Sequence, residues 1–310
     1  MIKKTLYFGN PIYLSLRNGQ MLLRLPEVEK SDVLPGDFKR QAARSFPIED
    51  LGVVILDHQQ ITITQGLLDA LIENNCAIIT CNKQRMPVGM MLPLSGNTIQ
   101  SERFRKQLDA SQPLKKQLWQ QTMQYKIRNQ ATMLQSVMGK PAKNMLAWAD
   151  SVRSGDPDNL EARAAVYYWR NLFPAIPNFV RSREGTAPNA LLNYGYAILR
   201  AVVARALVSS GLLPTLGIHH HNKYNAYCLA DDIMEPYRPY VDRCVVEIVA
   251  SGTDGAEISK DSKAKLLSIP TLDVEICGQK SPLMVAVSHT TASLYKCFSG
   301  EVRKIVYPEM

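Results

Sequence analysis

Hydrophobic and polar residues alternate with the short period of β-strands over about the first ninety residues. Two apolar runs, 12–16 and 21–25, flank Arg17-Asn18-Gly19-Gln20, and an Asn-Gly pair between such runs predicts a hairpin. Short segments rich in β-branched residues predict further strands at 52–56, 61–64 and 76–80. One helix is predicted between the last two, over about 65–73, with Thr64 as its N-cap.

After a turn-rich segment the apolar residues recur with a period near 3.6, which predicts helices. We expect them over about 100–139, 159–174, 187–210, 225–235, 240–251 and 282–303. The predicted fold class is α+β, with a small β-rich N-terminal domain followed by a larger all-α C-terminal domain. The predicted boundaries are 1–92 for the first domain, 93–100 for a linker and 101–310 for the second.

Composition places the chain among ordinary globular proteins, with 46% hydrophobic and 21% charged residues. The six cysteines include no Cys-x-x-Cys pair, which is typical of a reducing compartment. The apolar run after Lys3-Lys4 is broken at Gly9-Asn10-Pro11, too early for a secretory signal, and no stretch approaches the ~18 apolar residues of a membrane span. We therefore expect a cytoplasmic protein.

The net charge of +8 is concentrated between residues 101 and 150, where nine basic residues face three acids. Trp119 and Tyr125 are interleaved among them, a pattern typical of nucleic-acid contacts. The alternative is a solvated helix face. The candidate DNA contacts that charge suggests in this segment are Arg103, Arg105, Lys106, Lys115 and Lys116.

Common catalytic motifs are absent: there is no phosphate-binding P-loop, no Gly-x-Gly-x-x-Gly, no Gly-x-Ser-x-Gly and no His-Glu-x-x-His. Instead, His219, His220 and His221 stand together in a predicted turn, followed by Asp231, Asp232 and Glu235. Asp232 and Glu235 are three residues apart and would project from one helix face. Carboxylates with imidazole suit Mg²⁺ or Mn²⁺, while three histidines leave Zn²⁺ open.

Glu161 is a third candidate, in the first turn of the helix predicted over 159–174. An acid there favours the helix dipole, but the helical wheel puts Glu161 near the apolar face, where an unpaired carboxylate is costly. The helix over 187–210 carries one polar stripe, formed by Asn189, Asn193, Tyr196 and Arg200. This stripe either hydrogen-bonds neighbouring helices or lines a cleft that holds a phosphate and a metal.

Four ordered segments resemble the CRISPR spacer-acquisition integrase, most closely its version from type II systems. They are EARAAVYYW at 161–169, NALLNYGYAILR at 189–200, GIHH at 217–220 and ADDIMEPYRPYVD at 230–242. The resemblance implies a metal triad of Glu161, His220 and Glu235, with Asp232 as an auxiliary ligand and Mg²⁺ or Mn²⁺ as the cofactor. His219 or His221 stays open as a substitute for His220. Pro236 predicts that the helix ends or kinks at Glu235.

The activity that the resemblance implies is integration of short DNA fragments into a CRISPR array by transesterification, with cutting of branched DNA at the same site. If the polar stripe of the helix over 187–210 lines a cleft, Asn193, Tyr196 and Arg200 are further candidate DNA contacts. The implied partners are double-stranded DNA, a second copy bound through the N-terminal domain, a small ferredoxin-like protein and an RNA-guided effector nuclease. Two alternatives stay open: a non-catalytic basic nucleic-acid-binding protein with a structural His/acid cluster, and a zinc hydrolase.

Overall fold

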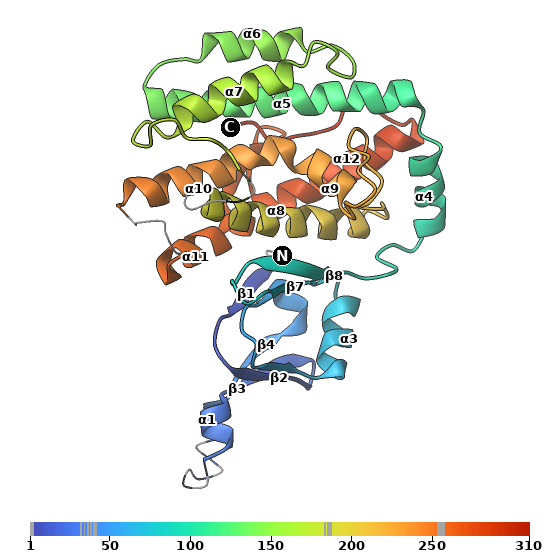
Figure 1. Cartoon of the computed structure of the whole chain (residues 1–310). Coiled ribbons are helices and arrows are strands. Elements are labelled where there is room, and N and C mark those ends of the chain that lie inside the picture. The colour runs from blue at the N-terminus through green and yellow to red at the C-terminus, as the bar shows by residue number, and fades with distance from the viewer. Residues whose placement is uncertain are drawn as a thin grey trace. The chain divides into compact units, whose positions relative to one another are not determined.

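The computed structural model describes residues 3–31, 33, 35, 37, 39, 42–182, 184, 188–252 and 258–310. The chain divides into two compact units, Met1–Gly96 and Asn97–Met310, and the division falls inside the segment 93–100. The first unit is rich in strands and the second in helices (Figure 1). The α+β fold class expected from the hydrophobic pattern is therefore confirmed.

The N-terminal unit consists of two four-stranded sheets, in the orders β1-β5-β7-β8 and β4-β3-β2-β6 (Figure 1). The first sheet contains β1 (Lys4–Phe8), β5 (Leu51–Leu56), β7 (Ala77–Cys81) and β8 (Pro87–Met91). The second contains β2 (Ile12–Arg17), β3 (Gln20–Arg24), β4 (Arg44–Pro47) and β6 (Ile61–Ile63). Strands β1, β5 and β7 are parallel, and β8 is an antiparallel edge.

Apolar side chains from the strands and from α3 (Gln65–Glu73) form the core of this unit, with Leu14, Met21, Leu51 and Leu67 almost fully buried. The short elements α1 (Pro26–Glu29) and η1 (Ile48–Asp50) also belong to this unit. Alternate residues of β2 are buried, which explains the alternating pattern of that segment, whereas β5 is buried on both faces over Leu51–Ile55.

The predicted hairpin is confirmed. Strands β2 and β3 pair antiparallel, with Arg17 opposite Gln20. Asn18 and Gly19 both have positive φ, 51° and 69°, the backbone conformation that two-residue hairpin turns require. The predicted strands at 52–56, 61–64 and 76–80 and the helix at 65–73 also form, whereas β1, β4 and β8 were not predicted.

In the helical unit, the single helix expected over 100–139 is wrong. The chain instead forms α4 (Gln100–Leu108) and α5 (Gln112–Met138). The Ser111 side chain accepts a hydrogen bond from the Leu114 amide, and Pro113 occupies the first turn of α5. An N-cap followed by proline starts a new helix at this point, because proline cannot continue an earlier one.

The remaining helices follow the predicted ranges to within a few residues, with α6 and α11 unpredicted. The elements after α5 are α6 (Lys143–Ser151), α7 (Leu160–Leu172), α8 (Asn189–Ser209), α9 (Cys228–Met234), η2 (Glu235–Tyr237), α10 (Arg238–Ala250), α11 (Lys260–Leu267), η3 (Ile269–Thr271) and α12 (Leu283–Ser299). Helices α6 and α7 pack along α5, and α8 packs against α9, α10, α11 and α12 (Figure 1).

Helix α8 is the central helix of this unit. It is the one described helix that is long and apolar enough to cross a membrane by length and composition, contrary to the expectation that no stretch approaches a membrane span. Because 78% of its most apolar window is buried inside the protein, the apolar residues are explained by the core.

The expectation of an all-α second domain needs one correction. Strands β9 (Asp273–Ile276) and β10 (Gln279–Pro282) form an antiparallel hairpin, and Cys277 and Gly278 in its turn both have positive φ. The hairpin receives the end of the chain through a bridge between Glu275 and Glu309. Four-residue strands are too short for their period to stand out in the sequence.

Candidate active site

Helix α7 presents Glu161 from its first turn. The Asp156 carboxylate accepts hydrogen bonds from the amides of Leu160 and Glu161, at 3.0 and 2.9 Å, and so satisfies two of the free N–H groups at the helix start. Asn159 precedes the first helical residue but its side chain makes no capping hydrogen bond, and Asp158 pairs with Arg153. Asp156 therefore fixes the backbone from which Glu161 projects.

One lysine joins the two candidate glutamates. Lys126, in the middle of α5, places its Nζ 2.6 Å from Glu161 Oε1 and 2.7 Å from Glu235 Oε2. The side chains are 9% exposed for Lys126, 27% for Glu161 and 6% for Glu235. Burial alone would lower the pKa of Lys126, but the charges of Glu235 and Glu161 outweigh it and raise the pKa, so the ammonium stays charged.

The turn after α9 positions Glu235. Helix α9 ends at Met234, and Glu235–Tyr237 forms a 3₁₀ turn, as the presence of Pro236 predicted. The Pro236 carbonyl accepts a hydrogen bond from the Asn129 side chain of α5, at 2.8 Å. Arg238 Nη2 lies 3.0 Å from Glu235 Oε1. Burial raises the pKa of Glu235, but Arg238 and Lys126 together lower it below its ordinary value.

Asp232 holds the histidine loop. Its buried carboxylate accepts hydrogen bonds from the amides of Ile218, His219 and His220, at 2.7, 2.9 and 3.3 Å, and contacts the His220 Nδ1. A Cβ on Gly217 would lie 2.4 Å from the His220 carbonyl oxygen and 2.7 Å from Asp232 Oδ2, so only glycine fits there.

The three histidines have different surroundings. His220 pairs with Asp232, and this hydrogen bond, reinforced by the charges of Asp232, Glu235 and Glu161, raises its pKa despite partial burial. His219 stacks on the buried Trp119 ring with centroids 4.0 Å apart, and burial lowers its pKa. The His221 side chain is exposed. His220 is thus the histidine that both a positioning carboxylate and the two glutamates influence.

The donors at this site fit a hard divalent cation. Two carboxylates and one imidazole nitrogen, Nε2 of His220, are left to bind it, and a carboxylate on the other ring nitrogen is the usual support for a metal-binding histidine. Glu235 Oε2 is buried and accepts no hydrogen bond of good geometry despite the nearby ammonium. Among the described residues, however, no three His, Cys, Asp or Glu side chains already surround one point, and Lys126 lies between the two glutamates.

A buried network that the sequence did not reveal adjoins the site. Asp242 of α10 accepts hydrogen bonds from the hydroxyls of Tyr168 (α7) and Tyr196 (α8). Burial raises the pKa of Asp242 to about 6, although these hydrogen bonds and the nearby arginines oppose the shift. The Arg238 guanidinium lies over the Tyr196 ring, 4.7 Å from its centroid. Arg238 therefore connects this network with Glu235.

The polar stripe of α8 binds other parts of the protein. Asn189 and Asn193 accept hydrogen bonds from Arg181, at 3.1 and 2.6 Å, and Tyr196 is bound to Asp242. Arg200 Nε lies 2.6 Å from Asp231 Oδ1. These contacts match the interpretation of the stripe as a seam between helices.

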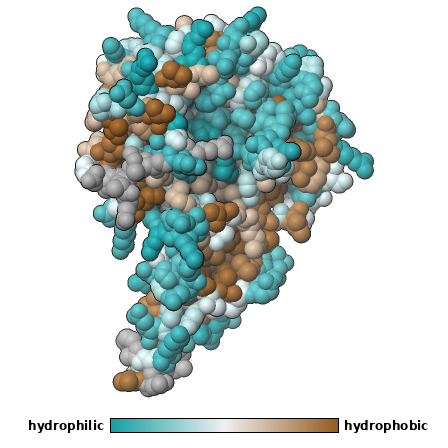
Figure 2. Space-filling model, viewed as in Figure 1, coloured by the Kyte–Doolittle hydropathy of each residue, from teal (hydrophilic) through white to brown (hydrophobic). Residues whose placement is uncertain are grey.

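The predicted DNA contacts fall into two groups. The Arg103 guanidinium donates a hydrogen bond to the Ser210 carbonyl at 2.8 Å and lies over the Tyr295 ring, so these contacts stabilise the fold. Arg105, Lys106 and Lys116 are exposed, and Lys115 is half-buried. Figure 2 also shows a hollow lined by hydrophilic residues on the visible face of the helical unit.

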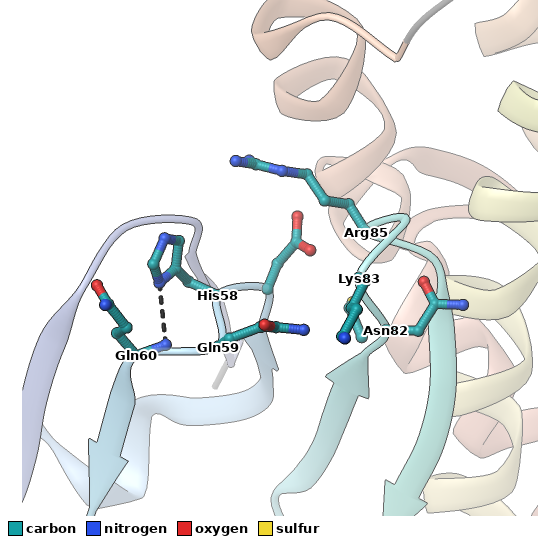
Figure 3. A pocket seen from close by; sticks show the side chains of 8 residues that line it. His58, Gln59, Gln60, Asn82, Lys83 and Arg85 are labelled. Carbon is teal, nitrogen blue, oxygen red and sulfur yellow. Dashed lines mark hydrogen bonds between the residues drawn. The ribbon is translucent and has the colours of Figure 1, made fainter.

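The N-terminal unit contains a separate polar pocket of about 350 Å³. It lies between the loop that carries His58, Gln59 and Gln60 and the turn that carries Asn82, Lys83 and Arg85, beyond the carboxyl ends of β5 and β7 (Figure 3). The backbone amide of Gln60 donates to His58 Nδ1 at 3.1 Å, which supports the interpretation of His58 as a turn residue. None of the candidate triad residues lines this pocket.

Solved structures with the same fold define the class of protein. A casposase bound to its integration product superposes with a TM-score of 0.74 at 19% identity, covering 98% of this chain and 92% of that one. A Cas1 protein from Thermotoga maritima gives a TM-score of 0.74 at 15% identity, covering 96% and 97%. The fold is therefore the one shared by Cas1 proteins and a casposase.

Sequence comparison gives the family itself. The family model described as CRISPR associated protein Cas1 matches residues 29–269, and the chain belongs to this family. The CRISPR-associated endonuclease Cas1 of Neisseria meningitidis serogroup C is 38% identical over 252 residues, 81% of this chain and 82% of that one. The CRISPR-associated endonuclease Cas1 2 of Pyrobaculum aerophilum is 29% identical over 270 residues, 83% and 90% of the two chains. The resemblance stated from the sequence motifs is thereby confirmed.

Proposed function

We propose that this chain is a divalent-metal-dependent DNA integrase and endonuclease that inserts short DNA fragments into a CRISPR array. The oxygen of a fragment's 3′-hydroxyl bonds to a phosphorus at the edge of the repeat, and the bond from that phosphorus to the repeat's own 3′-oxygen breaks. The observation that carries the proposal is the meeting of Glu161 and Glu235, 74 residues apart in the chain, on one ammonium group beside His220.

Each residue of the site has a proposed role. Glu161, Glu235 and His220 Nε2 would hold Mg²⁺ or Mn²⁺, and the chemistry such a cation supplies is polarisation of the phosphoryl oxygen and stabilisation of the leaving 3′-oxygen. Asp232 orients His220 and its loop, since its oxygens already accept hydrogen bonds from the loop amides. We therefore propose Asp232 as a positioning residue, in place of the auxiliary ligand expected from the sequence. Arg238 keeps Glu235 ionised.

DNA is the proposed substrate, bound through its backbone by Arg105, Lys106, Lys115 and Lys116. The similar fold of a casposase bound to its integration product supports this choice. A chain of a Cas6-RT-Cas1–Cas2 complex also matches, with a TM-score of 0.74 at 19% identity over 99% of this chain and 36% of that one, which supports a small second subunit. The effector nuclease and the cytoplasmic location stay predictions.

Dimerisation through the N-terminal unit is likewise proposed. Edge strand β8 exposes apolar side chains, with Val88 64% and Met91 45% exposed. Hydrophobic residues also gather on one side of this unit in Figure 2. An apolar edge strand is a surface that proteins normally cover, and a second copy would do so.

The test is a half-site integration assay with a fluorescent duplex, a supercoiled target and Mg²⁺, Mn²⁺ or Zn²⁺ added after chelation. We expect strand transfer with Mg²⁺ or Mn²⁺ and at least a ~10²-fold loss in Glu161→Gln and His220→Ala, because each removes one proposed ligand. His221→Ala is the matched control, since it changes an exposed histidine of the same loop. Full integration by Glu161→Gln would refute the assignment, and activity restored only by Zn²⁺ would favour the zinc hydrolase.

A further inference from the structure

Lys126 occupies the position between the two carboxylates that the proposed cation needs. Its Nζ lies 2.6 Å from Glu161 Oε1 and 2.7 Å from Glu235 Oε2, and the other oxygen of Glu235 lies 3.0 Å from Arg238. Both oxygens of Glu235 therefore already face a positive group of the protein. With its side chain 9% exposed, Lys126 is shielded from bulk water at this point.

The ammonium has a clear purpose in the absence of metal. If Lys126 were missing, Arg238 alone would compensate the buried Glu235 and Glu161 would lose its cation, and buried charges need a partner. A divalent cation would serve the same carboxylates but repel the ammonium strongly in a site with little water. The ammonium and the cation therefore compete for one position.

We propose that Lys126 is a built-in counter-ion that occupies the metal site and is displaced when a divalent cation binds. This inference rests on the proposed function. The side chain is suited to this movement, because lysine carries a compact charge on a flexible four-carbon stem. Helix α5 stays fixed by its buried face, so only the side chain has to move. The displaced ammonium becomes available to a DNA phosphate at the same site.

The test measures Mn²⁺ binding to the full chain without DNA, by electron paramagnetic resonance of the free ion. Lys126→Met keeps the length of the side chain and removes its charge. We expect it to bind Mn²⁺ at least ~10-fold more tightly than the wild type, as removal of one like charge from a shielded site implies. Lys280→Met, which changes an exposed lysine of strand β10 outside the site, is the control and should leave the affinity unchanged. Equal or weaker binding by Lys126→Met would overturn the proposal.

A second measurement uses the unmodified protein, in case Lys126→Met fails to fold. Acetic anhydride labels accessible amines, and mass spectrometry reads each lysine. Labelling of Lys126 should rise when Mg²⁺ is added, while that of Lys115 stays constant; unchanged labelling of Lys126 contradicts displacement.

Glu161→Gln separates this inference from the proposed function. If Glu161→Gln leaves Mn²⁺ binding intact, the metal site itself is misassigned. If Glu161→Gln abolishes binding but Lys126→Met does not strengthen it, only the counter-ion role is wrong.

Discussion

At the scale of residues, the site is a balanced set of charges in a region of low water content. Lys126 and Arg238 compensate Glu161 and Glu235, and Asp232 compensates the loop amides and His220. Such a set holds together only as a whole, because removal of one member leaves another buried charge without a partner. Its members differ in exposure, so their removal has different costs.

Glu235→Gln should destabilise the protein more than Glu161→Gln. Glu235 is 6% exposed and faces two cations, so its loss should lower the free energy of unfolding by about 3 kcal/mol. Glu161 is 27% exposed and water shields its pair, so about 1 kcal/mol is expected. Urea unfolding followed by circular dichroism in metal-free buffer measures both values. Equal losses would show that burial does not set the cost.

At the scale of elements, helix ends and helix crossings place the functional groups. Helix α7 brings Glu161 from its capped start, the 3₁₀ turn after α9 brings Glu235, and the loop before α9 brings His220. Helix α5 supplies Lys126 and Trp119 beneath them. Three helices, α7, α8 and α10, then meet at Asp242.

The cap of α7 can be tested directly. Asp156→Ala removes the acceptor for two amides at the helix start and should lower the free energy of unfolding by about 1 kcal/mol. It should also reduce strand transfer, because Glu161 loses its fixed backbone. Asp158→Ala, two residues away and paired only at the surface, is the control and should change little. Similar effects of the two variants in unfolding and integration assays would argue against the cap.

The junction at Asp242 should make stability depend on pH. Its pKa is about 6 in the folded chain and 3.8 ordinarily, so the folded state binds the proton more tightly than the unfolded state. The contribution of this group to stability is therefore full below about pH 4 and is lost as the pH rises to about 6. We expect the unfolding free energy of the wild type, relative to Asp242→Asn, to fall by about 2 kcal/mol between pH 4 and 7. A constant difference across that range would contradict the raised pKa.

At the scale of the whole molecule, the helical unit carries both the candidate site and the basic segment 101–150. That segment holds nine basic residues. However, Lys126 is buried in the site, and Arg103 donates a hydrogen bond to the Ser210 carbonyl. Arg128 is paired with Asp150. The number of basic side chains left for DNA in this segment is therefore smaller than the sequence suggested.

The salt dependence of DNA affinity measures how many of these basic side chains contact phosphate groups. Each phosphate contact contributes roughly −0.9 to the slope of log affinity against log salt on a duplex. The double variant Lys115→Ala/Lys116→Ala should therefore reduce the slope by about 2, measured by fluorescence anisotropy. Lys280→Ala, which removes an exposed lysine of strand β10, is the control for net charge. If the double variant shifts the slope by no more than twice the shift of Lys280→Ala, charge acts without specific contacts.

The sequence alone determined the fold class, the hairpin at Asn18-Gly19 and most helices, because burial on one face imposes a period of two or 3.6 residues. Its motifs also singled out Glu161, His220 and Glu235. Only the tertiary structure showed that Lys126 forms ion pairs with both glutamates and that Asp232 accepts hydrogen bonds from the histidine loop. It also showed that Tyr196 donates a hydrogen bond to Asp242. A lysine on the buried face of α5 was the one local signal for its role. Which charges meet depends on how helices distant in the sequence cross, and the local period of hydrophobic residues does not encode that crossing.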